Sequence, residues 1–234
     1  MSLRAEAVLF DKDGTLFDFH ATWSVWALDA MRTLSGGVAD RLEAMADSAR
    51  FDLVAGRFLP DSPIIAGTNR EAAACLARVL PDRSVEEVEH FLMVSAAEAP
   101  LAEAVPLAPL LARLGQMGLV LGVMTNDTEY AARAHLETAG ITQAFDFVAG
   151  FDSGHGAKPD PAPLLAFARS IGLDPARCVM VGDSTHDLIA GRAAGMQCVG
   201  VLTGPAAAED LASQADVVLP DIGHLPGWLG DRAA

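Results

Sequence analysis

Apolar residues follow two different rhythms along this chain. After about residue 106, short apolar runs of strand length alternate with segments in which apolar residues recur every three or four positions, as in a helix. The strands are expected at residues 7–10, 119–124, 145–150, 178–181, 197–201 and 217–219, and the helices between them at 110–117, 127–139, 161–171, 186–194 and 206–213. Apolar strands that alternate with helices are typical of a parallel sheet covered on both faces. We therefore expect an α/β fold with a Rossmann-like parallel sheet.

Residues 19–100 have a different pattern, with helical spacing of the apolar residues and no convincing strand. Four helices are expected, at about 20–34, 38–58, 68–80 and 84–99. Gly36-Gly37 supplies an end signal for the first helix and Ser84 a start signal for the last. This change of pattern predicts an all-α domain at residues 19–100, inserted into a discontinuous α/β domain made of residues 1–18 and 101–234.

The composition indicates an ordered globular protein that carries excess negative charge. Of its 234 residues, 51% are hydrophobic, and the formal net charge is −15. This charge repels nucleic acids and anionic membranes, so neither is an expected partner. A small anionic substrate would have to be held by local positive charge. We expect a monomer or a homodimer.

The cysteines and the start of the chain favour a cytoplasmic protein. Cys75, Cys178 and Cys198 are widely spaced and form no CxxC pair, so neither a disulfide framework nor a thiolate zinc site is expected. Free buried thiols in a reducing compartment are the simplest interpretation. The apolar run at residues 7–10 is too short for a signal peptide or a membrane span.

Polar side chains recur where the predicted parallel strands end. These positions hold Asp11, Asp13, Thr125, Asn126, Lys158, Asp183 and Asp187. Taken singly, each has an ordinary explanation as a helix cap, a helix-start acid or a solvated loop residue. The carboxyl ends of parallel strands, however, meet at one edge of the sheet, and ligands bind in the crevice there. The recurrence of these residues at equivalent strand ends therefore indicates a functional site.

The acids among these residues need a compensating charge if they share one crevice. Two carboxylates about 4 Å apart repel by about 4 kcal/mol at an effective dielectric constant of about 20. A divalent cation would relieve this repulsion. Because the available ligands are oxygens and the six histidines are scattered, the sequence favours Mg²⁺.

Four segments, in this order, resemble the signatures of one known family. They are Asp11-Lys12-Asp13-Gly14-Thr15-Leu16, Thr125-Asn126, Lys158-Pro159-Asp160-Pro161 and Gly182-Asp183-Ser184-Thr185-His186-Asp187. As a set they resemble the haloacid dehalogenase-like hydrolases, and among these the phosphoglycolate phosphatase-like branch. The helical insertion after the first segment resembles the cap domain of that superfamily.

The resemblance implies a role in phosphoryl transfer for each matching residue. Asp11 would be the nucleophile that forms an aspartyl-phosphate, and Lys158 would neutralise the phosphate that otherwise repels it. Asp13 would protonate the leaving alkoxide and then activate water. Thr125 and the backbone amide of Asn126 would hold the phosphoryl oxygens.

The resemblance also implies a magnesium site made by the same loops. Asp11, Asp183 and the backbone carbonyl of Asp13 would bind Mg²⁺ directly. Asp187 would act through a water molecule or would orient Lys158. These roles agree with the need for a cation that the clustering of acids predicts.

The function expected from these features is a magnesium-dependent phosphatase that acts on a small, phosphoglycolate-like phosphomonoester. Within the superfamily that the chain resembles, dehalogenases lack an acid at the position of Asp13 because their halide leaves without a proton, so Asp13 disfavours a dehalogenase. Thr15 disfavours a sugar-phosphate mutase, because valine is common at this position in the β-phosphoglucomutase branch. A mutase or a phosphonate hydrolase is the alternative within the same fold. From a different class, the alternative is a phospho-acceptor signalling module without turnover. A catalytically silent scaffold is disfavoured because all the expected chemical groups are present.

The start of the insertion departs from the family pattern and leaves the substrate open. Phe19-His20 stands where many relatives have serine. Trp23 and Trp26 lie one helical turn apart, which favours burial against other helices of the insertion over a substrate-facing patch. Whether His20 contacts substrate is left open.

Overall fold

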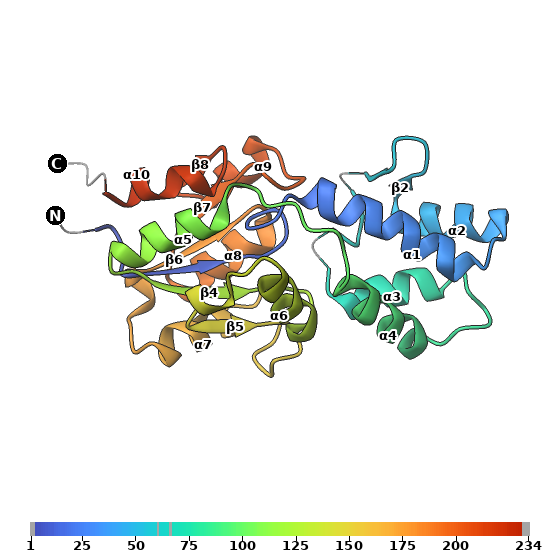
Figure 1. The fold of residues 1–234 in the computed structure, drawn as a ribbon, viewed down its shortest axis with the longest axis horizontal. Helices are drawn as coiled ribbons and strands as arrows, with labels where there is room; N and C mark the ends of the chain where they lie inside the picture. The colour runs from blue at the N-terminus through green and yellow to red at the C-terminus, as the bar shows by residue number, and fades with distance from the viewer. Residues whose placement is uncertain (1–2, 60, 66, 231–234) are drawn as a thin grey trace.

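A six-stranded parallel sheet lies at the centre of the computed structural model, which describes residues 3–59, 61–65 and 67–230. The strand order is β5-β4-β1-β6-β7-β8 (Figure 1). The strands are β1 (Ala7–Phe10), β4 (Val120–Met124), β5 (Phe147–Ala149), β6 (Cys178–Gly182), β7 (Gln197–Val201) and β8 (Val217–Leu219). The predicted α/β fold with a parallel sheet is confirmed, and each strand of this sheet overlaps an expected one.

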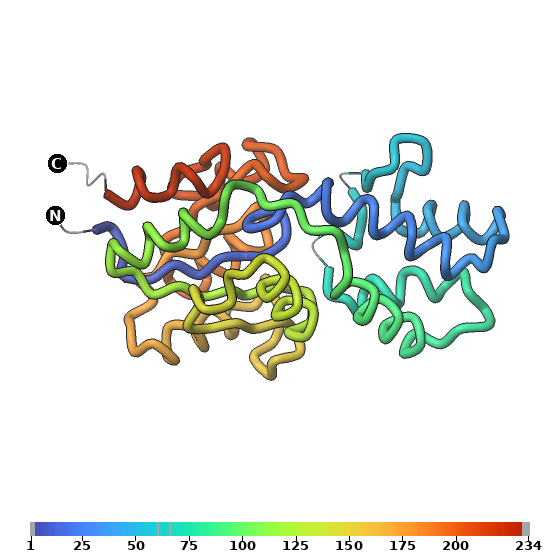
Figure 2. The backbone as a smooth tube through the Cα atoms, viewed as in Figure 1, coloured from blue at the N-terminus to red at the C-terminus, as the bar shows by residue number. Residues whose placement is uncertain are grey.

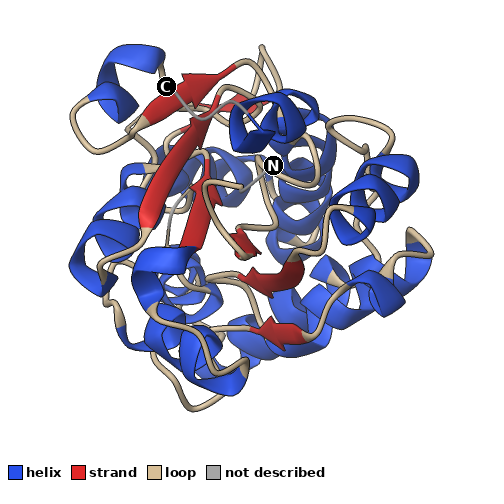
Figure 3. Cartoon of the chain, turned by 90° about the vertical axis from the view of Figure 1, so that its left-hand side faces the viewer, coloured by secondary structure: helices blue, strands red, loops and turns tan. Residues whose placement is uncertain are grey.

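Helices cover both faces of this sheet (Figure 3). They are α5 (Leu107–Gln116), α6 (Glu129–Thr138), α7 (Ala162–Ser170), α8 (Thr185–Ala194), α9 (Ala208–Ala212) and α10 (Leu225–Gly230), with short 3₁₀ helices η2 (Thr142–Ala144), η3 (Pro175–Arg177) and η4 (Ile222–His224). Val8 and Phe10 share one hydrophobic cluster with α5 and α10. Ala7 and Leu9 share another with α7 and α8. Since successive strand residues point to opposite faces, β1 is buried on both.

The connections place three strand ends next to one another. β1 pairs with β4 on one side, where Phe10 lies beside Val123, and with β6 on the other, where Phe10 lies beside Val181. The chain continues from β4 outward to β5 and from β6 outward to β7, so the strand order reverses about β1. Ligands bind at such reversal points in open α/β sheets. The loops after β1, β4 and β6 are therefore the ones that can build a site.

Residues 20–96 form a second, mainly helical part beside the sheet (Figure 1). It contains the π-helical turn η1 (His20–Ser24), α1 (Val25–Ser35), α2 (Ala39–Ala49), β2 (Phe51–Asp52), β3 (Arg57–Phe58), α3 (Asn69–Ala77) and α4 (Val85–Ala96). Two neighbouring segments of chain join it to the sheet (Figure 2), and the Asp18 N–H donates to the Ala102 carbonyl at 2.8 Å between them. The helical part has a hydrophobic cluster of its own, with Met31, Met45 and Leu92 in it.

One helix of this part is shorter than the apolar pattern predicts. The helix expected at 38–58 ends at Ala49, and residues 51–58 form the hairpin of β2 and β3, so the insertion is not all-α. Asp52 Oδ1 accepts hydrogen bonds at 2.8 and 2.9 Å from the N–H groups two and three residues later. Gly56 has φ 64°. This turn chemistry outweighs the helical spacing of the apolar residues nearby.

The last helix, α10, was not expected. Its sequence contains a proline and two glycines, which weaken any helical pattern. Its position depends on packing, because Leu225 and Leu229 are fully buried against the sheet.

None of the helices in the described part of the chain is both long enough and apolar enough to span a membrane. The division of the chain into 1–18 with 101–234 and 19–100 stays a prediction. Residues 1–2 and 231–234, at its two ends, lie outside the described residues.

Candidate active site

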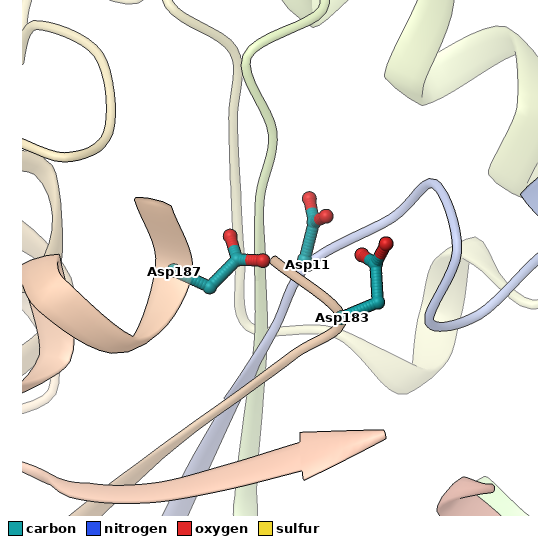
Figure 4. Close-up of side chains that lie close together, drawn as sticks. All are labelled: Asp11, Asp183 and Asp187. Atoms are coloured by element: carbon teal, nitrogen blue, oxygen red, sulfur yellow. The ribbon is translucent and has the colours of Figure 1, made fainter. Parts of the chain in front are cut away.

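Three aspartates meet at the carboxyl edge of the sheet. Asp11 follows β1, Asp183 follows β6, and Asp187 lies in the first turn of α8 (Figure 4). All three are buried, and one carboxylate oxygen from each lies within 4.8 Å of the others. The structure thus brings together acids from distant parts of the sequence.

Two glycines leave room for the Asp183 carboxylate. Gly14 has φ 83°, a left-handed conformation that favours glycine. A Cβ atom at Gly14 or at Gly204 would collide with the Asp183 carboxyl group. Thr203 Oγ1 donates to the Gly14 carbonyl at 2.6 Å and joins the two loops. Thr203 and Gly204 follow β7 and were not expected at the site; their position after a parallel strand was the available signal.

Lys158 supplies positive charge among these acids. Its Nζ lies 2.7 Å from Asp11 Oδ1 and 2.6 Å from Asp187 Oδ1, and its side chain is 3% exposed. Asn126 fixes the Lys158 backbone, because its Nδ2 donates to the Lys158 carbonyl and its Oδ1 accepts from the Lys158 N–H, both at 2.9 Å. The Asn126 side chain therefore positions Lys158, a role that the sequence did not suggest.

Burial and mutual repulsion oppose ionisation of the clustered acids. Desolvation raises the pKa of Asp11 to about 7, aided by Asp187 and Asp13 and opposed by Lys158. Desolvation also raises the pKa of Asp183 well above its ordinary value, and the charges of Asp11 and Asp187 add to this. Burial disfavours the Lys158 ammonium, yet Asp11 and Asp187 outweigh it and raise the pKa of that group.

This charge distribution fits a divalent cation. The buried site holds three carboxylates and one ammonium, which contacts two of them, so ionisation of all three leaves excess negative charge. The carboxylates offer the oxygen ligands that hard cations prefer. The residues present at the site are therefore compatible with the metal that the sequence predicts.

Asp13 lies beside this cluster rather than in it. Thr125 Oγ1 is 3.5 Å from Asp13 Oδ2, a long hydrogen bond, and accepts from the Asp127 N–H at 3.1 Å. The side chains of Asp13 and Thr125 thus meet between the ends of β1 and β4. Among the described residues, the three-acid cluster does not include the Asp13 carboxylate. The contribution of Asp13 to metal binding through its backbone carbonyl stays a prediction.

A fully buried lysine next to Asp13 was missed at the sequence level. Lys12 Nζ donates to Asp13 Oδ1 at 2.8 Å, to Asp127 Oδ2 at 3.2 Å and to His135 Nδ1 at 3.0 Å. It also lies 5.0 Å from the centre of the Trp23 ring. All three N–H bonds of the ammonium are used. Burial opposes its charge, but Asp13 and Asp127 raise the pKa of Lys12 and keep it protonated.

His135, on α6, links Lys12 to the helical part. An ammonium can only donate, so Nδ1 of His135 accepts from Lys12. Nε2 then carries the proton and donates to the Ala96 carbonyl at 2.7 Å, at the end of α4. Burial, followed by the charge of Lys12, lowers the pKa of His135 from 6.5 to about 4. The ring is therefore neutral at physiological pH.

Acidification is expected to destabilise the fold through His135. The folded protein keeps the ring neutral down to a pKa of about 4, whereas the unfolded chain protonates it near the ordinary pKa of 6.5. The contribution of the neutral His135 ring to the free energy of unfolding is complete above pH 6.5 and is lost as the pH falls toward 4. The loss amounts to about 3 kcal/mol. Urea unfolding of wild type and His135→Gln at several pH values measures it, and the variant should lose less.

His224→Gln is the control for this pH dependence, because the His224 side chain is 56% exposed. It should follow wild type at every pH. A His135→Gln protein that loses as much stability on acidification as wild type would contradict the assignment to His135.

A cavity extends from the acids to the helical part. Asp11 and Lys158 line one side, and Trp23 and Trp26 line the other. The Trp23 ring also lies 5.9 Å from the His135 ring, between centres. Trp23 is thus buried in the hydrophobic cluster of the helical part, as expected, and it also borders the cavity at the junction of the two parts.

His20, which was left open as a substrate contact, is not among the residues described as lining the cavity. Its side chain is exposed, and its ring packs on Phe19 with 5.6 Å between ring centres. Phe19 itself is among the residues that line the cavity.

The reversal of strand order about β1, the acids after β1 and β6 and the lysine between them define a Rossmann-like α/β protein with its site at the carboxyl edge of the sheet. The family model for haloacid dehalogenase-like hydrolases matches residues 5–195. The chain belongs to the haloacid dehalogenase-like hydrolase family, and it is an enzyme.

Individual relatives agree with this assignment. The chain is 34% identical over 227 residues to a phosphoglycolate phosphatase of Xanthomonas campestris pv. campestris, covering 95% of this chain and 96% of the relative. It is 29% identical over 228 residues to an N-acetylmuramic acid 6-phosphate phosphatase of Pseudomonas aeruginosa, covering 93% and 91%. The crystal structure of a protein described as a phosphoglycolate phosphatase from Lactobacillus delbrueckii subsp. bulgaricus has a TM-score of 0.71 at 22% identity, covering 97% and 100%, which shows a shared fold.

Proposed function

We propose that this hydrolase is a magnesium-dependent phosphatase that cleaves a small phosphomonoester through an aspartyl-phosphate. The observation that carries the proposal is the pair of contacts from the buried Lys158 ammonium to Asp11 and Asp187, at 2.7 and 2.6 Å. A cation held against a carboxylate can neutralise a phosphoryl group that approaches that carboxylate. The names of two relatives, phosphatases for different phosphate esters, support the reaction class.

In the first half of the reaction, Asp11 would attack phosphorus while the bond from phosphorus to the ester oxygen breaks. The ester oxygen would leave with the electron pair and take a proton from Asp13, releasing the alcohol. Thr125 and the backbone amide of Asn126, at the end of β4, would donate hydrogen bonds to the phosphoryl oxygens. Lys158 would lower the repulsion between the nucleophile and the phosphate.

In the second half, water would release the phosphoryl group. Asp13, now ionised, would take one proton from water as the water oxygen attacks phosphorus. The bond from phosphorus to the Asp11 oxygen would then break, which returns Asp11 to a carboxylate and Asp13 to its protonated form. Inorganic phosphate is the second product.

Three groups would hold Mg²⁺ at this site: the carboxylates of Asp11 and Asp183 and the backbone carbonyl of Asp13. When bound, the ion supplies the positive charge that allows the acids and a phosphate group to share the site. Asp187 would keep Lys158 in place rather than bind the ion directly, and its ion pair with the Lys158 ammonium supports this role.

We further propose that residues 19–100 act as a cap over a catalytic domain made of residues 1–18 and 101–234. The separate hydrophobic cluster of the helical part and the cavity lined from both sides support this division. A cap of this kind would exclude bulk water during transfer to Asp11. The expected partner is a small phosphorylated metabolite, and a cytoplasmic monomer or homodimer stays a prediction.

Release of inorganic phosphate from p-nitrophenyl phosphate tests this function. We expect many turnovers per chain with Mg²⁺, loss of activity with EDTA and recovery when Mg²⁺ is restored. A phospho-acceptor signalling module would release at most one phosphate per chain, and a mutase would keep the phosphate on its product. Lack of multiple turnover in the presence of Mg²⁺ would contradict the proposal.

Asp183→Asn is expected to raise the Mg²⁺ concentration needed for half-maximal activity by about tenfold or more. The amide keeps the shape of the carboxylate and loses the charge that attracts the cation. Titration of activity with Mg²⁺ measures the shift. Asp29→Asn, at a carboxyl group with 69% of its side chain exposed, is the control and should match wild type. An unchanged requirement in Asp183→Asn would remove Asp183 from the metal site.

A further inference from the structure

The helical part gives the cavity a wall that is mostly apolar. We call this the apolar wall, and it consists of Phe19, Trp23, Trp26, Phe58, Ile64 and Ile65. The rings of Trp23 and Trp26 lie 5.0 Å apart, and those of Phe19 and Phe58 lie 6.1 Å apart, between centres. The rings pack against one another, so the helical part presents a packed aromatic surface to the cavity.

No basic side chain of the helical part lines the cavity, as far as the described residues show. Two of its arginines pair elsewhere with acids, Arg41 with Asp82 at 3.2 Å and Arg70 with Glu89 at 2.7 Å. Lys158, across the cavity, already contacts two carboxylates. A second anionic group on the substrate would therefore find no cationic partner at the apolar wall.

The start of α3 does not supply an anion site in this wall. Thr68 and Asn69 line the cavity there. The Thr68 N–H donates to Glu71 Oε2 at 2.7 Å, and the Glu71 N–H donates to Thr68 Oγ1 at 3.2 Å. The Glu71 carboxylate thus already occupies the positive end of the helix. A substrate carboxylate approaching α3 would meet a like charge.

We propose that the alcohol released from the substrate is uncharged and presents an apolar face to the apolar wall. It follows that the enzyme discriminates against esters whose alcohol carries a carboxylate, such as phosphoglycolate, in contrast to the phosphoglycolate-like substrate expected from the sequence. The inference rests on the proposed phosphatase function, because a phosphoryl group held by Asp11 and Lys158 directs the alcohol toward the opposite side of the cavity.

The physical basis is the difference between burying an apolar face and burying an unpaired charge. An apolar ring placed against Trp23 and Trp26 releases water from both surfaces and stacks favourably. A carboxylate in the same place loses its hydration, and none of the described side chains that line the cavity from the helical part supplies a cation in exchange. Ile64 and Ile65 are then specificity-determining positions, because a side chain with a positive charge there would reverse the preference.

Two matched pairs of esters separate charge from shape. Phosphoglycolate and its amide have nearly the same size and differ in charge, whereas benzyl phosphate and ethyl phosphate are both neutral and differ in the ring. We expect kcat/KM to be at least about tenfold higher for the amide than for phosphoglycolate, and at least about tenfold higher for benzyl than for ethyl phosphate. The measurements use wild type with Mg²⁺, and p-nitrophenyl phosphate is the reference substrate.

Ile65→Lys tests the wall directly. The variant adds an ammonium to the apolar wall, and Val54→Lys adds the same charge in the hairpin turn, where Val54 is 99% exposed and is not among the residues that line the cavity. We expect Ile65→Lys to raise the ratio of kcat/KM for phosphoglycolate to that for its amide by about tenfold. Val54→Lys should leave this ratio at the wild-type value.

The outcomes separate this inference from the proposed function. The inference is overturned if wild type hydrolyses phosphoglycolate as efficiently as its amide, or ethyl phosphate as efficiently as benzyl phosphate, while p-nitrophenyl phosphate still turns over. These comparisons need no variant, so they stand even where Ile65→Lys does not fold. If wild type hydrolyses none of these esters, p-nitrophenyl phosphate included, the proposed phosphatase function is refuted, and the inference with it.

Discussion

Asp11→Asn is expected to abolish turnover of p-nitrophenyl phosphate, with kcat at least about 1,000-fold below wild type. The amide cannot attack phosphorus as a carboxylate does. Lys158, which lies 2.7 Å from Asp11 Oδ1, can still attract the phosphate but has no nucleophilic carboxylate beside it. Steady-state phosphate release measures the loss. Acid-quenched wild type should also carry a hydroxylamine-sensitive phosphoryl group, and the variant should carry none.

The same substitution should leave the fold intact. Burial raises the pKa of Asp11 to about 7, so the ionised carboxylate is disfavoured in the folded protein and a neutral amide removes this cost. We expect a Tm close to that of wild type. Asp29→Asn, at an exposed carboxyl group on α1, is the matched control and should retain full activity. A folded Asp11→Asn protein that turns over at the wild-type rate would refute Asp11 as the nucleophile.

Asp11 and Asp183 were predictable because strand ends can be located from apolar runs, and Lys158 because it lies in the loop after another such run. In a parallel sheet the carboxyl ends share one edge, so the residue that follows each run is a candidate for the same crevice. This reasoning requires no knowledge of which strands are neighbours. It depends on local pattern and on one topological rule, and the structure indeed places Asp11 beside both Asp183 and Lys158.

Lys12 and His135 were not predictable in this way, because their partners are determined by tertiary packing. Lys12 contacts Asp127 and His135, which lie 115 and 123 residues later in the chain. A lysine between two acids is usually solvated, and a single histidine on a helix carries no specific signal. The one hint was position, since Lys12 lies two residues after β1, a strand that is buried on both faces.

Prediction from sequence meets the same limit in the helical part. The spacing of Trp23 and Trp26 correctly predicts burial on a helix, but spacing cannot say what lies opposite. The opposite surface is a cavity lined by acids, and this is what makes the two rings relevant to substrate choice. The hairpin after Ala49 was not predicted for a related reason. A few apolar residues in helical phase suggested that the helix continues, although Asp52 and Gly56 are residues typical of a turn.

Lys12→Met is expected to lower the free energy of unfolding by about 3 to 5 kcal/mol. The Lys12 side chain is 0% exposed, and its Nζ lies 2.8 Å from Asp13 and 3.2 Å from Asp127. Methionine fills a similar volume but leaves two carboxylates without their cation, and burial already raises the pKa of one of them, Asp127. Since the free energy of unfolding of a domain is about 5 to 15 kcal/mol in total, the urea concentration at the midpoint of unfolding at neutral pH should fall markedly.

A double variant separates the charge effect from the packing effect. In Lys12→Met with Asp127→Asn, one of the two uncompensated carboxylates is gone, so the two single losses should not add, and the shortfall measures the coupling between Lys12 and Asp127. Arg41→Met, which breaks an ion pair with Asp82 at the surface, is the control and should leave stability nearly unchanged. A Lys12→Met protein that unfolds at the same urea concentration as Arg41→Met would mean that Lys12 does not stabilise the junction of the sheet and the helical part.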